Sequence, residues 1–144
     1  MTQQQLTEDQ PMVELTVEEC WDLLSQTEVG RLAYRLVDEI HLIPINYAVE
    51  GRTILFRTAE GNKLLAAEMH SEVAFEIDWV GDDSAWSVMV RGHLRHLDEG
   101  EQHRLSGLRI HPWIHSFKYD HVELAPAIVT GRRFLLHKED DEDD

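Results

Sequence analysis

Two cations flank a glycine-containing turn near the middle of the chain, in the stretch FRTAEGNKLLAAEM of residues 56–69. Arg57 lies near the end of a predicted strand, and Lys63 lies in the first turn of a predicted amphipathic helix. A cation at the start of a helix opposes the helix dipole, and a bound anion reverses the sign of that interaction. The helix-start N–H groups, the Gly61 turn and the two cations therefore predict a phosphate cradle.

The residues of this stretch also allow a plainer interpretation. Arg57 on a strand edge and Lys63 at a helix start can be ordinary solvated cations. The spacing GxxxxGK[ST] is absent, so this is not the P-loop of a nucleoside triphosphatase. The residue types alone leave both interpretations open.

The size and charge of the chain limit the classes of function. Its 144 residues, 42% of them hydrophobic, predict one domain with a real core. The net charge of −15 argues against a nucleic-acid partner, because an acidic surface repels phosphate backbones. We expect a flexible polar arm at 1–13, one domain at 14–137 and a disordered acidic tail at 138–144.

Cysteine content and hydropathy indicate the compartment. Cys20 is the one cysteine of the sequence, which excludes an intrachain disulfide. We find no N-terminal targeting pattern and no apolar run approaching ~18 residues. We therefore expect a cytoplasmic protein without a membrane partner.

The pattern of apolar residues predicts mostly strands. Thr16 and Glu19 form a capping-box pattern for a helix that ends near Thr27, and Gly92 is a predicted bulge or close-approach point in a long strand. Further helices are expected after Lys63 and over 99–108. Strands are predicted at 29–36, 41–47, 53–58, 72–79, 86–97 and 122–134, the last interrupted at Pro126 and Gly131. About six antiparallel strands with two to three helices favour a mainly β barrel.

Nine histidines raise the question of a metal or haem site. His111 and His115 have a His-x3-His spacing that would put both rings on one helix face. No acidic or cysteine partner follows at a recognisable spacing, so a structural role is favoured over a metal or haem ligand. No side chain shows the pattern of an activated nucleophile or a general acid–base group, and we therefore name no catalytic residue.

Three blocks of sequence together resemble the flavin-binding split-barrel family that includes pyridoxamine 5′-phosphate oxidase and its short relatives. They are HLIPINYAVEGRTILFRTAEGNKLLAAEMHSEVAFEIDWV at 41–80, WSVMVRGHLRHL at 86–97 and VTGRRF at 129–134. The resemblance covers roughly residues 16–134. It implies an FMN-binding split β-barrel that forms a homodimer with two flavin sites between the subunits.

The resemblance also implies which residues bind the cofactor. The segment along the isoalloxazine ring would be Ile43, Pro44, Ile45 and Asn46. The flavin phosphate would be held by Arg57, Thr58 and Lys63. At the start of the long strand, Trp86 and Ser87 would reach the flavin, at the dimer interface.

Departures from the oxidase pattern bear on function. Asn46 stands where the true oxidase has a basic residue, and Trp86 and Ser87 stand where it has an arginine–glutamine pair. The substrate-binding C-terminal segment of the oxidase has no counterpart here. The resemblance thus implies an FMN-dependent oxidoreductase with an unknown small-molecule substrate and a nicotinamide or deazaflavin reductant. The alternatives are a deazaflavin-dependent reductase on the same fold and a non-catalytic flavin- or haem-binding dimer.

Overall fold

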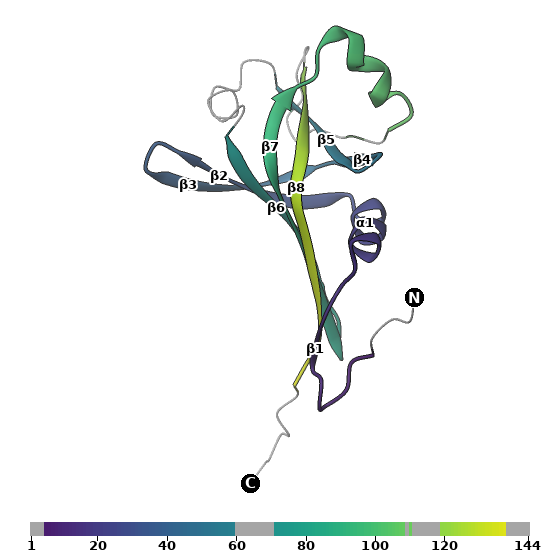
Figure 1. Ribbon diagram of the computed structural model, residues 1–144. Helices are drawn as coiled ribbons and strands as arrows, with labels where there is room; N and C mark the ends of the chain where they lie inside the picture. Colours follow the sequence, from purple (N-terminus) through teal and green to yellow (C-terminus); the bar gives the residue numbers. More distant parts are fainter. Residues whose placement is uncertain (1–4, 60–70, 109, 111–118, 138–144) are drawn as a thin grey trace.

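The computed structural model describes residues 5–59, 71–108, 110 and 119–137, and these form a mainly β fold (Figure 1). The predicted helix after Lys63 and the pair His111 and His115 lie outside the described residues. In the described residues, the helical elements are α1 (Val17–Gln26) and the 3₁₀ helix η1 (Glu99–Leu105). The strands are β1 (Met12–Glu14), β2 (Val29–Leu36), β3 (Glu39–Asn46), β4 (Ala48–Glu50), β5 (Thr53–Ala59), β6 (Glu72–Val80), β7 (Ser84–His96) and β8 (Tyr119–Leu135).

One antiparallel sheet contains all of these strands. Its order is β3-β2-β6-β7-β8-β5-β4, and β1 pairs with β8. The sheet does not close by hydrogen bonding, but β3 and β5 approach each other across its open side. This confirms a split barrel, with eight strands in the described residues rather than about six. The strands β1 and β4 were missed because three residues are too few to show a two-residue period.

Helix α1 begins and ends as the sequence predicted. The Thr16 hydroxyl accepts a hydrogen bond from Glu19 N at 3.2 Å, and the Glu19 carboxylate accepts one from Thr16 N at 3.0 Å. The helix buries Cys20, Trp21 and Leu24 against the sheet. Burial, and secondarily the charge of Glu19, raises the pKa of the Cys20 thiol to about 11, so this cysteine is a packing residue rather than a nucleophile.

Side chains alternate between two faces of the sheet. The inner face carries the core, in which Phe75, Val88 and Val90 are fully buried. The outer face carries charged residues together with exposed apolar ones such as Met89 and Ile128. Because successive residues of a strand point to opposite faces, neighbours in sequence reach different environments.

Glycines allow two close approaches along the longest strands. The β7–β8 register shifts between Arg91 and Gly92, and a Cβ on Gly92 would lie 2.0 Å from the carbonyl oxygen of Ala125. The predicted bulge is confirmed. A Cβ on Gly131 would lie 2.7 Å from the sulfur of Cys20, so this glycine lets α1 pack on β8. The expected interruption at Gly131 was wrong, because β8 runs through it; at Pro126 the strand also continues, but its register with β7 shifts beside this residue.

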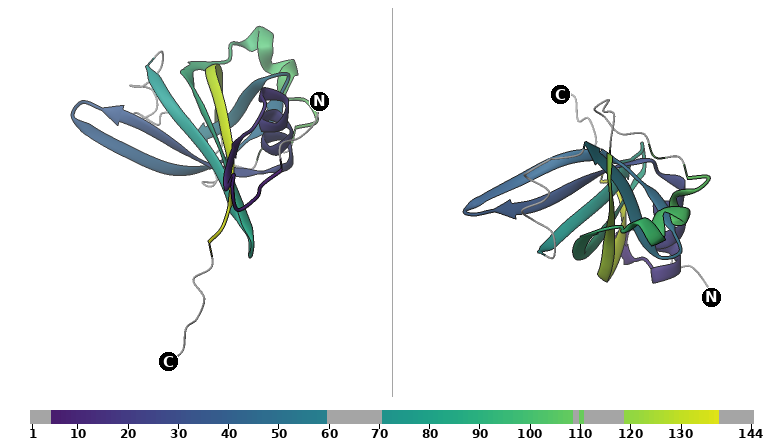
Figure 2. Two further views of the ribbon diagram at one scale, coloured as in Figure 1. Left: turned by 60° about the horizontal axis from the view of Figure 1, so that its bottom comes forward. Right: turned by 90° about the horizontal axis from the view of Figure 1, so that it is seen from above.

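Two further predictions need correction. Met12 and Val13, expected in a flexible arm, form part of β1, and Val13 is buried by pairing with β8. The helix expected over 99–108 is a 3₁₀ helix that ends at Leu105, and Gly107 follows with a φ of 79°. None of the helices in the described part of the chain is long and apolar enough to cross a bilayer. Figure 2 shows the β2–β3 hairpin projecting from the body, away from α1.

Candidate functional site

The predicted site residues fall into two groups in the structure. Six of them lie on β3 and β5, which approach each other at the open side of the barrel. Trp86 and Ser87 lie near the start of β7. Lys63 lies outside the described residues, so the structure does not test its place in a phosphate cradle.

Strand β3 ends the sheet order. Its backbone pairs with β2 along one edge, and no strand of the described residues pairs with its other edge. Ile43 and Ile45 pack toward the core, whereas Pro44 is exposed on the opposite face. An unpaired strand edge presents backbone N–H and C=O groups. These groups could form hydrogen bonds with the isoalloxazine ring, as the resemblance implies for this segment.

Arg57 and Thr58 lie side by side in sequence but on opposite faces of β5. Thr58 is buried at 9% exposure, on the same face as the core residue Phe56. Arg57 lies beside His121 of β8. The Nε atom of Arg57 is buried and has no hydrogen-bond partner among the described residues. The side chains of Arg57 and Thr58 thus point to opposite faces of one strand, and only Arg57 has a buried polar atom without a partner among the described residues of β5.

The charge of Arg57 acts on His121, its neighbour on β8. Burial, and after it the positive charge of Arg57, lowers the pKa of His121, while Asp120 acts in the opposite direction. An anion bound at Arg57 would supply the acceptor that its Nε atom lacks among the described residues, and it would offset the effect of Arg57 on His121.

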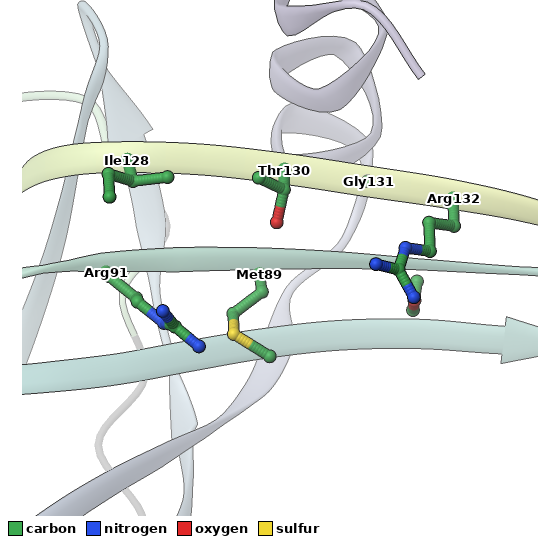
Figure 3. Close-up of a pocket in the computed structure, with 7 residues that line it drawn as sticks. Met89, Arg91, Ile128, Thr130, Gly131 and Arg132 are labelled. Carbon is green, nitrogen blue, oxygen red and sulfur yellow. The ribbon is translucent and has the colours of Figure 1, made fainter. Parts of the chain in front are cut away.

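Trp86 and Ser87 also separate onto opposite faces. Ser87 lines a cavity of about 340 Å³ on the outer face with Met89, Thr130 and Arg132 (Figure 3). Trp86 lines a different cavity, of about 420 Å³, between the inner face and α1. The two neighbours therefore do not act on one ligand from the same side of the sheet.

A single chain does not bring these two groups together. Pro44, Arg31, Glu76 and Met89 occupy successive strands in one row, so Pro44 and Met89 are separated by three strand spacings, about 14 Å. Between them the guanidinium of Arg31 contacts Glu76 at 2.9 Å and Asp78 at 2.8 Å.

Several residues of this outer face were missed by sequence reasoning. Arg91 borders both the Ser87 cavity and a cavity of about 630 Å³ beside the β2–β3 hairpin, which is also lined by Arg35 and Ile40. Strand alternation could have placed them on one face of each strand, but the β2–β6 and β7–β8 registers set their neighbours. No cluster of three metal-ligating side chains occurs within the described ranges.

Comparisons with known proteins agree with this fold. A family described as pyridoxamine 5′-phosphate oxidase matches residues 16–133. A solved structure described as the FAD binding protein from Mycobacterium smegmatis is 40% identical, with a TM-score of 0.75, and covers 85% of this chain and 99% of its own. A Corynebacterium glutamicum structure named for the same family is 37% identical, with a TM-score of 0.82, and covers 92% and 100%.

A curated relative extends the similarity to Mycobacterium tuberculosis. This protein, named as uncharacterized, is 39% identical over 95 residues, which are 65% of this chain and 86% of the relative.

Proposed function

The chain belongs to the pyridoxamine 5′-phosphate oxidase family, and we propose that it is a flavin-binding oxidoreductase of that family. The flavin ring would lie along the β3 backbone and its phosphate at Arg57. The M. smegmatis relative named as FAD binding supports a flavin as the cofactor class. When bound, a flavin supplies hydride and electron transfer, and the protein binds and orients it.

The observation that carries this proposal is the state of Arg57. Its Nε atom is buried without an acceptor among the described residues. A guanidinium offers a planar set of donors that matches phosphate oxygens, and such charge-assisted bonds are strong. Arg57 also lies on β5, the strand that approaches β3, so phosphate and ring contacts would come from the two sides of one opening.

We propose further that the active form is a homodimer. Ser87 lies three strands from Pro44 within one subunit, whereas the resemblance assigns both to one flavin. A second copy of the chain would supply Ser87 to the site formed by β3 and β5. The exposed apolar residues Met89 and Ile128 beside the Ser87 cavity support burial of this face.

The test is a titration of the purified protein with FMN and with FAD, followed by absorption and flavin fluorescence. We expect one of the two to bind with a two-band visible spectrum, which also decides between them. Arg57→Glu should weaken binding at least about tenfold through loss of the charged pair. The matched control is Arg52→Glu, because Arg52 is exposed and pairs weakly with Glu18 at 3.9 Å.

Other outcomes separate the alternatives. If the Arg57→Glu and Arg52→Glu variants bound the flavin with equal affinity, Arg57 would not be the residue that holds its phosphate. A single deazaflavin-type band in the protein as purified would favour the deazaflavin reductase, and a Soret band would favour haem. Flavin that stays bound but is not reduced by nicotinamide or deazaflavin would favour a non-catalytic binding protein.

A further inference from the structure

Two tryptophans lie opposite each other where the inner face of the sheet extends past α1. Trp79 of β6 pairs with Trp86 of β7, and Trp86 pairs in turn with Arg133 of β8. All three are on the face that elsewhere forms the core. With Leu23 and Asp22 of α1 they border the cavity of about 420 Å³ described above.

The indole of Trp79 is exposed although its face is the core face. Its exposed fraction is 51%, whereas Ile77, two residues earlier on the same face, is buried. A Cβ on Gly81 would lie 2.1 Å from Cη2 of Trp79, so the indole lies directly over this glycine. The glycine therefore permits an indole position that leaves one aromatic surface at the cavity.

Arg133 brings a positive charge to the same cavity. No carboxylate in the described part of the chain forms an ion pair with its guanidinium. Glu19 and Asp22 of α1 also line the cavity; the Glu19 carboxylate accepts the Thr16 backbone N–H at 3.0 Å, and Asp22 is exposed. An arginine that lies beside two indoles and takes part in no ion pair among the described residues can receive an anionic group next to an aromatic ring.

We propose that this cavity binds a planar aromatic molecule that carries an anionic group. Its ring would contact Trp79 and Trp86, and its anion would pair with Arg133. The cavity volume falls within the range of ~300–1,000 Å³ typical of small-molecule sites. Because Trp86 and Ser87 point to opposite faces, this site is separate from the Ser87 cavity, and the inference does not depend on flavin binding.

The experiment uses naphthalene-2-carboxylate as probe and naphthalene-2-methanol as its uncharged counterpart. Binding is followed on the full chain through the ¹⁵N-labelled indole N–H signals of its four tryptophans. We expect the carboxylate to shift the signals of Trp79 and Trp86, assigned with Trp79→Phe and Trp86→Phe variants. The signal of Trp21, which is 7% exposed in the core, should not move.

Adjacent arginines give a matched pair of variants. Arg133→Gln should weaken the carboxylate about tenfold or more and leave the alcohol unchanged, because it removes one charged pair. Arg132→Gln changes the same charge on the opposite face and should leave the carboxylate affinity unchanged. Gly81→Ala displaces the Trp79 indole and should weaken both probes.

Three results would overturn the proposal. The first is the absence of Trp79 and Trp86 shifts at millimolar naphthalene-2-carboxylate. The second is an equal loss of affinity in the Arg132→Gln and Arg133→Gln variants. The third is displacement of the bound carboxylate by FMN or FAD with the same two indole signals shifted, which would make the cavity part of the flavin site.

Discussion

Three arginines, Arg57 of β5, Arg95 of β7 and Arg104 of η1, differ sharply in whether their charge has a partner. Arg95 and Arg104 join a network with Glu50, Glu101 and Glu123. In it Arg95 Nε donates to Glu123 at 3.0 Å, Arg104 donates to Glu50 at 2.9 Å, and Arg104 also contacts Glu123 closely. Arg57, on the same face of β5 as this network, has a buried Nε without a partner among the described residues.

Arg95 and Arg104 act as structural cations, and we propose that Arg57 is a binding cation. The network joins η1 to β4, β7 and β8, and the charges of its arginines are paired with carboxylates of the same chain. A buried polar group without a partner costs stability unless something outside the described residues satisfies it. The comparison therefore supports the proposal that Arg57 binds a ligand, whereas the ion pairs of Arg95 and Arg104 join elements of the fold.

The largest expected effect comes from breaking the network at its most buried member. The Glu123 side chain is 6% exposed and faces two arginines. Glu123→Gln should destabilise the fold by roughly 2 kcal/mol, since Arg95 and Arg104 each lose a charge-assisted hydrogen bond to it while keeping Glu101 as a partner. The measurement is urea unfolding at pH 7. Glu18→Gln, in an exposed pair, is the control and should change stability by less than about 0.5 kcal/mol. A similar loss of stability in Glu123→Gln and Glu18→Gln would show that the network is no more important for stability than an exposed ion pair.

The substitution Arg57→Met tests the arginine whose Nε atom has no partner among the described residues. It should not lower the free energy of unfolding, in contrast to a substitution in the network. Replacing a polar group that lacks a partner by an apolar one of similar length should leave the flavin-free protein equally stable or stabilise it by up to about 1 kcal/mol. Arg104→Met should destabilise it in the same urea experiment. A loss of stability in Arg57→Met as large as in Arg104→Met would show that Arg57 is structural.

Lowering the pH should reduce the stability that the network contributes. The hydrogen bonds from Arg104 lower the pKa of Glu50, and those from Arg95 lower the pKa of Glu101. A carboxylate with a lowered folded-state pKa contributes stability that is present above its unfolded pKa, about 4.3, and is lost as pH falls below it. Urea unfolding at pH 7 and pH 4 should show this loss, and Arg104→Met should reduce it. An unchanged pH dependence in that variant would argue against the network.

The smallest effect concerns His121, the neighbour of Arg57. Its pKa is lowered first by burial and second by the charge of Arg57. Its proton is therefore bound more readily in the unfolded chain, and stability falls as pH drops below the unfolded value of about 6.5. In Arg57→Met the pKa of His121 should rise toward its ordinary value in an NMR titration. A bound flavin phosphate should have the same effect in the wild type.

Local features of this protein follow from short stretches of sequence. The capping box of Thr16 and Glu19 and the bulge at Gly92 were predicted because each depends on neighbours in the chain or on one missing side chain. The family resemblance predicted the split barrel from the order of three blocks. Phosphate binding at Arg57 remains a prediction, now supported by the buried Nε atom.

Other features depend on strand pairing between distant segments, and only the tertiary structure decided them. The β6–β7–β8 register aligns Trp79, Trp86 and Arg133, and the β5–β8 register places Arg57 beside His121. The charge network joins residues from 50 to 123. A sequence pattern gives the face of each strand, because alternation is local, but a neighbour across the sheet is fixed by long-range packing.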